Sequence, residues 1–126
     1  MKRIYVNLKR FDIPKEFGGV NSIISPENWG EYIVKETQDA LSEYRSEDVE
    51  FIMYLPEAHL IPAIRALNDD ANLQIGSQSV HFDDTAVGGN FGAFTTKRTA
   101  NAMKALNTTS TIIGHCEERS DKIGIL

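Results

Sequence analysis

The chain has 126 residues, of which 41% are hydrophobic and 25% charged, and its formal net charge is -5. This composition predicts one globular unit over residues 1–126 and excludes a low-complexity or fibrous chain. The acidic balance argues against a nucleic-acid partner, because a polyanion would be repelled. A local group of cations could still bind a small phosphate ester.

The N-terminal segment is basic, and its apolar stretch is interrupted at Asn7 and Lys9. We therefore expect neither a signal peptide nor a membrane span. Cys116 is the only cysteine, so no internal disulfide can form. Together these features predict a cytoplasmic protein.

Strands and helices are predicted to alternate along the chain. Apolar, β-branched stretches predict strands near residues 3–9, 49–55, 73–80 and 110–114. Helical spacing predicts helices at about 26–44, 56–67 and 95–106, and a fourth beginning near 123. Ser25 and Pro26 form a typical helix start, whereas Pro62 indicates a kink or a displaced start.

This alternation favours parallel strands joined by right-handed crossovers. The hydrophobic pattern alone is equally compatible with a doubly wound sheet and with a segment of a barrel. Motifs at the ends of the predicted strands have to decide between these two α/β architectures.

Four short motifs occur at those strand ends: Val6-Asn7-Leu8-Lys9, Ile75-Gly76-Ser77-Gln78-Ser79, Gly92-Ala93-Phe94-Thr95, and Ile112-Ile113-Gly114-His115-Cys116-Glu117-Glu118-Arg119. They resemble the Asn-x-Lys, Gly-Ala-Gln-Asn, Gly-Ala-Phe-Thr and Ile-Gly-His-Ser-Glu-Arg-Arg elements of the triosephosphate isomerases, in the same order. The resemblance implies a TIM (β/α)8 barrel, of which this chain holds the first four β/α units.

The same resemblance implies an isomerase that moves a proton between adjacent carbons of a phosphorylated triose through an enediolate. His115 would be the catalytic electrophile, and Lys9 a catalytic and substrate-binding cation. Asn7 would bind substrate or position Lys9. Gln78 would support the first loop, while Cys116 and Glu117 would lie just behind the site. Without the resemblance, Lys9 would be taken for a solvated lysine and Glu117 for part of a surface salt bridge.

Three further residues are implied as contacts of a homodimer: Thr95, Lys97 and Glu118. Lys97 occupies a position where the family usually has glutamate, and Glu118 one where it usually has arginine. We interpret this as an ion pair with exchanged signs across the subunit interface. The resemblance implies no metal or other cofactor, and His59 and His81 lack partners at ligand spacing. His59 is expected to lie on the surface or to be hydrogen-bonded.

Two connections, residues 10–25 and 81–91, are longer than the family normally carries. The glutamate base of the family matches no residue among the 126, and a complete barrel needs about 250 residues. We therefore expect activity to require a C-terminal half. Two alternatives stay open: isomerisation of another small sugar phosphate, such as a tetrulose phosphate, and a non-catalytic half-barrel that associates with itself.

Overall fold

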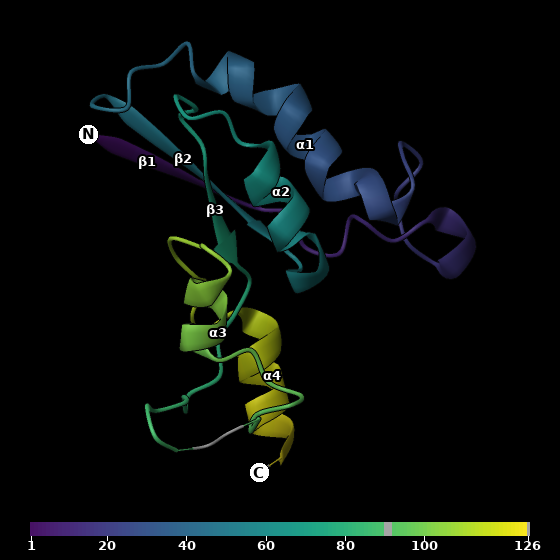
Figure 1. Cartoon of the computed structure of the whole chain (residues 1–126). Coiled ribbons are helices and arrows are strands. Elements are labelled where there is room, and N and C mark those ends of the chain that lie inside the picture. The colour runs from purple at the N-terminus through teal and green to yellow at the C-terminus, as the bar shows by residue number, and fades with distance from the viewer. Residues whose placement is uncertain (90–91, 126) are drawn as a thin grey trace.

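The computed structural model describes residues 1–89 and 92–125 (Figure 1). Three parallel strands form the sheet in the order β1 (Lys2–Asn7), β2 (Val49–Leu55) and β3 (Gln74–Ser77). The second strand has the predicted bounds. The first ends two residues earlier than predicted, and the third occupies only the middle of its predicted range. β1 is an edge strand of this sheet.

In the described residues, four α-helices and two short 3-10 helices accompany the sheet: η1 (Lys15–Phe17), α1 (Pro26–Leu41), η2 (Glu57–His59), α2 (Leu60–Ala66), α3 (Ala100–Ala105) and α4 (Cys116–Ile125). Pro26 begins α1 as predicted, because a first-turn residue needs no hydrogen-bonded N–H. Pro62 lies in the first turn of α2, so it marks a displaced helix start rather than a kink.

The hydrophobic core lies between one face of the sheet and the pair α1 and α2, which Figure 1 shows side by side. Alternate residues of β2 point into it, since successive side chains of a strand face opposite sides. The buried members are Trp29, Val34, Met53, Leu55, Leu60, Ala63, Leu73, Ile75 and Met103. Packing of α1 and α2 thus holds the sheet in place, and with it the carboxyl ends of the strands.

The predicted fourth strand over 110–114 is not formed. Its residues run parallel to β3 but pair through one isolated bridge, Ser77 to Thr111. Ser77 donates a backbone hydrogen bond to Ser110 at 3.1 Å, and Ile112 donates one to Ser77 at 3.1 Å. β3 ends at Ser77, so the segment has no continuing strand along which a ladder could extend.

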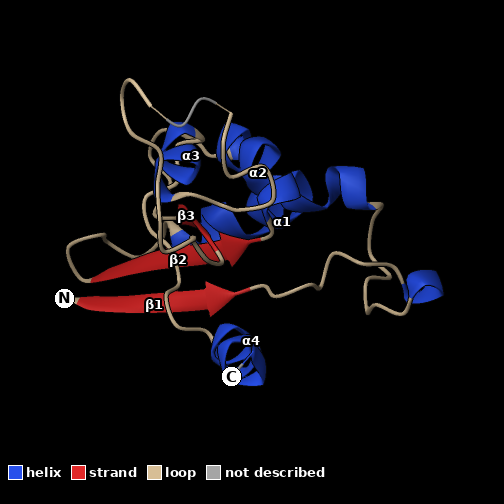
Figure 2. Cartoon of the chain, turned by 90° about the horizontal axis from the view of Figure 1, so that it is seen from below, coloured by secondary structure: helices blue, strands red, loops and turns tan. Residues whose placement is uncertain are grey.

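The third and fourth helices also differ from prediction. α3 begins at Ala100 rather than 95, because the Thr99 side chain caps it by accepting from the Ala102 backbone at 3.2 Å. Phe94, the residue before the predicted start, has a positive φ of 63°. α4 begins at Cys116 rather than near 123, two residues after Gly114, which has φ 75°. Figure 2 shows α4 well apart from α1 and α2.

The long connection between β1 and α1 is ordered by its own contacts. Pro14 and Asn21 form a bridge around η1, and Asn21 Nδ2 donates to the carbonyls of Asp12 and Ile24 at 2.9 and 2.7 Å. The other long connection ends at Asn90 and Phe91, which lie outside the described residues. No helix in residues 1–89 and 92–125 has the length and hydropathy needed to cross a bilayer.

Candidate active site

The candidate site lies at the carboxyl ends of the strands, where parallel topology gathers their last residues. Asn7 ends β1, and its Oδ1 accepts from the Lys9 backbone N–H at 2.9 Å and from Gln78 Nε2 at 3.2 Å. Gln78 Nε2 also lies 2.7 Å from the Lys9 carbonyl, to which it donates. Two side-chain amides therefore hold the Lys9 backbone from both sides.

This support explains an unusual backbone conformation. Lys9 has φ 50°, in the left-handed region that a side chain makes unfavourable by about 1–2 kcal/mol. The turn brings Lys9 and the following Arg10 to one cavity, although neighbouring residues of an extended strand would point to opposite faces. Asn7 and Gln78 thus position Lys9 through hydrogen bonds to its backbone.

His115 forms the N-terminal cap of α4. Its carbonyl accepts from the Arg119 backbone at 3.1 Å, and its Nδ1 accepts from the Glu117 backbone N–H at 3.1 Å. A backbone N–H can only donate, so the hydrogen bond requires an unprotonated Nδ1. In the neutral ring the proton is then on Nε2, which leaves Nε2–H as a donor for a ligand. Gly114, with φ 75°, sets the turn that presents this residue.

A cavity of about 180 Å³ connects these residues. Its lining consists of Asn7, Lys9, Arg10, Gln78, Ser79, Arg98, His115, Glu117 and Glu118. Three permanent cations and two carboxylates thus surround an imidazole. A site of this composition can bind a small anion and donate hydrogen bonds to an oxygen that gains charge.

Most of the predicted site residues therefore meet at one cavity, and three do not line it. Thr95 and Lys97 line a neighbouring cavity, of about 500 Å³, which Glu118 shares. Cys116 is exposed, with its Sγ 3.8 Å from His115 Nδ1. Among the described residues, Lys9 and Glu117 share the cavity without forming an ion pair.

The motifs pointed to neither Arg98 nor Arg10. Arg98 donates to Ser79 Oγ at 2.6 Å, and this contact places its guanidinium at the wall. Arg10 pairs with the buried Asp12, which lies 2.8 Å from His59 Nε2. His59 is thus buried and hydrogen-bonded, the second of its two predicted environments. The sequence signal for this network was Asp12, an acidic residue between the apolar Phe11 and Ile13.

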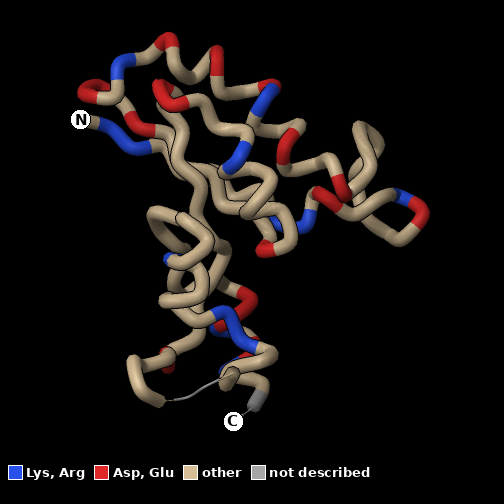
Figure 3. Tube along the Cα trace, viewed as in Figure 1, with Lys and Arg blue, Asp and Glu red and all other residues tan. Residues whose placement is uncertain are grey.

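No described group of three or more His, Cys, Asp or Glu side chains, within residues 1–89 and 92–125, could hold a metal ion. The charged side chains that line the cavity are Lys9, Arg10, Arg98, Glu117 and Glu118. Figure 3 shows Lys and Arg interleaved with Asp and Glu along the trace, so the cations gather at the cavity through folding and not through a basic run.

The fold and the cavity together define a parallel α/β protein with a cationic site at the carboxyl ends of its strands. Comparison with known proteins makes the class specific. The family model described as triosephosphate isomerase matches residues 27–122. The chain belongs to the triosephosphate isomerase family.

A curated relative agrees with this assignment. The chain is 32% identical over 90 residues to "Triosephosphate isomerase" of Alkaliphilus metalliredigens (strain QYMF). The aligned part covers 68% of this chain and 34% of that relative, so the chain spans about a third of the relative's length. His115 lies inside the range matched by the family model, whereas Asn7 and Lys9 precede it.

Proposed function

We propose that this chain supplies the electrophilic half of a triosephosphate isomerase site, which interconverts dihydroxyacetone phosphate and glyceraldehyde 3-phosphate. One observation carries the proposal: Lys9 and His115, 106 positions apart in the sequence, line the same cavity at the carboxyl ends of parallel strands. Family membership supports the reaction class, and the relative named above bears the same activity in its name.

The chemistry assigns a role to each group. A base removes a proton from the carbon next to the carbonyl, and the electron pair forms the carbon–carbon double bond of an enediolate. The carbonyl oxygen gains the negative charge, to which His115 Nε2–H donates and which the Lys9 ammonium stabilises. A proton passes from the neighbouring hydroxyl oxygen to the former carbonyl oxygen, and return of the first proton to the neighbouring carbon completes the isomerisation. The base itself is a glutamate in the family, and we propose that a C-terminal half provides it.

The direct test measures interconversion of the two triose phosphates by the 126-residue chain, alone and with an added C-terminal half of the barrel that carries the glutamate. We expect no turnover by the chain alone and turnover when the second half is present. Lys9→Met and His115→Gln should each abolish the rescued activity while leaving the far-UV circular dichroism unchanged. Turnover by the isolated chain that rises faster than linearly with its concentration would instead require a base supplied by self-assembled halves.

A second substrate is favoured by a specific feature, the ordered connection over residues 10–25. Its residue Arg10 lines the cavity, and its residues Phe11, Ile13 and Phe17 line, together with charged residues, an adjoining cavity of about 390 Å³. Such space could admit a longer carbon chain. Comparing kcat/KM for a triose and a tetrulose phosphate separates the candidates, because a triose-specific site would lose activity with the extra carbon.

A further inference from the structure

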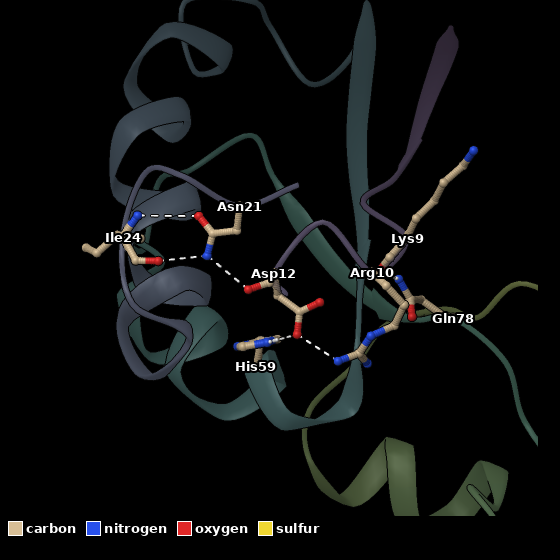
Figure 4. A network of polar contacts seen from close by, with 7 residues as sticks. All are labelled: Lys9, Arg10, Asp12, Asn21, Ile24, His59 and Gln78. Carbon is tan, nitrogen blue, oxygen red and sulfur yellow. Dashed lines mark hydrogen bonds and ion pairs between the residues drawn. The ribbon is translucent and has the colours of Figure 1, made fainter. Parts of the chain in front are cut away.

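A buried polar network lies next to the candidate site and takes no part in the chemistry described above (Figure 4). Asp12 Oδ2 accepts a hydrogen bond from Arg10 Nη2 at 2.7 Å and lies 2.8 Å from His59 Nε2. The side chains of Asp12 and His59 are 3% and 6% exposed, whereas that of Arg10 is 60% exposed. The network therefore joins an interior carboxylate to a cation at the surface.

The Asp12 carboxylate is held through Oδ2, whereas its Oδ1 is buried and has no hydrogen-bond partner among the described residues. Asn21 Nδ2 donates to the Asp12 carbonyl at 2.9 Å, which immobilises its backbone. His59 packs against Trp29 with ring centroids 5.0 Å apart. Gly30 lets α1 approach His59 closely, because an added Cβ at Gly30 would lie 2.8 Å from His59 Cβ. The carboxylate thus anchors the Arg10 guanidinium.

Arg10 extends from this anchor to the cavity that Lys9 and His115 also line. A guanidinium has five N–H donors in a planar arrangement, and among the described residues the Arg10 side chain donates one hydrogen bond, to Asp12. Its other donors are available at a partly exposed position. Figure 4 shows the Lys9 side chain directed away from the Asp12 network, so the two cations occupy different parts of the rim.

We propose that Arg10 is a substrate-binding residue of this site that binds an oxyanion of a phosphate ester, and that Asp12 and His59 are its positioning residues. This inference rests on the proposed function, which supplies the phosphorylated substrate. A guanidinium matches the geometry of phosphate oxygens, and one already held by a fixed carboxylate loses less side-chain freedom on binding. The long connection over residues 10–25 then serves to bring a phosphate-binding cation to the cavity.

Phosphate binding by the 126-residue chain tests this assignment without relying on turnover. Inorganic phosphate and glycerol 3-phosphate, with glycerol as the uncharged comparison, are titrated while the backbone amide signals of residues 9–11 and 115 are followed by NMR. Arg10→Met should raise the Kd for phosphate roughly tenfold, since it removes a charge-assisted hydrogen bond. The Kd of Arg10→Lys should lie between those of the original chain and of Arg10→Met, because lysine keeps the charge and loses the planar donors.

The matched control is Arg65→Met, which removes the same charge from an exposed position on α2. We expect it to leave the Kd within about twofold of the original chain. Equal binding by the Arg10→Met variant and the original chain would overturn the proposal, as would the absence of phosphate binding by the original chain.

Asp12→Asn separates positioning from simple charge. It removes a negative charge beside the cavity, so long-range electrostatics alone would tighten phosphate binding, whereas loss of the anchor should weaken it severalfold. Tighter binding by a folded Asp12→Asn variant would refute the positioning role. The Arg10 variants change an exposed side chain and decide the question if Asp12→Asn does not fold. Phosphate binding through Arg10 without isomerisation in the reconstituted assay would refute the proposed reaction and leave the anion site standing.

Discussion

Lys9 combines a strained backbone with the charge that the proposed reaction uses. Its φ of 50° is held by the hydrogen bonds of Asn7 and Gln78, and the residue lines the cavity. Strained residues of this kind persist where the surrounding structure fixes them, and they cluster at functional sites. The proposed function therefore accounts for a conformation that weakens the fold.

This strain can be measured by comparing two variants that both lose the charge. Lys9→Gly should be more stable than Lys9→Ala by about 1 kcal/mol, because glycine adopts a positive φ without a steric penalty. Urea denaturation gives the difference in the free energy of unfolding. Both variants should lack rescued isomerase activity.

Lys35, an exposed residue of α1, provides the control. There the order should reverse, with Lys35→Ala more stable than Lys35→Gly by about 1 kcal/mol, as in any helix interior. If the alanine variant is the more stable one at both positions 9 and 35, the positive φ of Lys9 does not lower the free energy of unfolding.

At the scale of elements, the segment 109–112 can lie beside β3 because residue 76 is a glycine. A Cβ at Gly76 would lie 2.6 Å from Tyr54 Cε1 and 2.7 Å from the Ser110 carbonyl oxygen. Tyr54 and Ser110 are themselves linked, with the tyrosine hydroxyl 3.2 Å from Ser110 Oγ. The approach of the segment 109–112 to the sheet, and hence the placement of His115 beyond it, depends on the missing side chain.

We expect Gly76→Ala to lower the free energy of unfolding by about 2 kcal/mol, because it overpacks a closed part of the fold. Gly124→Ala serves as the comparison, since no atom lies within 4 Å of a Cβ there and the residue is inside α4. That change should leave stability unchanged or raise it by up to about 1 kcal/mol. Thermal or urea unfolding checks both, and equal effects would contradict the packing argument.

At the scale of the whole molecule, the sheet of the described residues has an exposed edge at β1. β1 is an edge strand, and its Ile4 and Tyr5 are 46% and 59% exposed. Exposed edges that carry apolar side chains are usually covered by further structure. They are consistent both with a C-terminal half that completes a barrel and with the alternative of a self-associating half-barrel.

Glu118, an expected contact of a homodimer, has a carboxylate oxygen without a partner in the described part of the chain. Its Oε1 is buried and has no hydrogen-bond partner among residues 1–89 and 92–125. A buried carboxylate oxygen without a partner is unfavourable by about 1–3 kcal/mol or more. Lys97 lines the same cavity as Glu118 and is exposed, and the pairing of these two side chains between two copies is a prediction.

Charge reversal tests this pairing. Lys97→Glu should weaken self-association, because it sets two carboxylates against each other, and adding Glu118→Lys should restore much of it. Sedimentation equilibrium of the single and double variants gives the association constants. Strictly additive effects of the two changes would mean that the side chains do not meet.

The sequence by itself determined the class of this protein. Alternating apolar stretches gave the parallel strands, with β2 at its predicted bounds, and the four motifs gave the family that the comparisons show. These features are local, since a strand pattern or a Gly-His motif is complete within a few residues. They could therefore be found without knowing what each residue touches.

The tertiary structure decided what depends on partners far along the chain. It reduced the fourth strand to one bridge, began α4 at Cys116, and joined Arg10 to Asp12 and His59, which are 47 positions apart. Burial made His59 a partner of a carboxylate, and the turn at Lys9 brought two consecutive cations to one cavity. No local pattern encodes such contacts, because their energy comes from excluding water between segments that meet only when the sheet has formed.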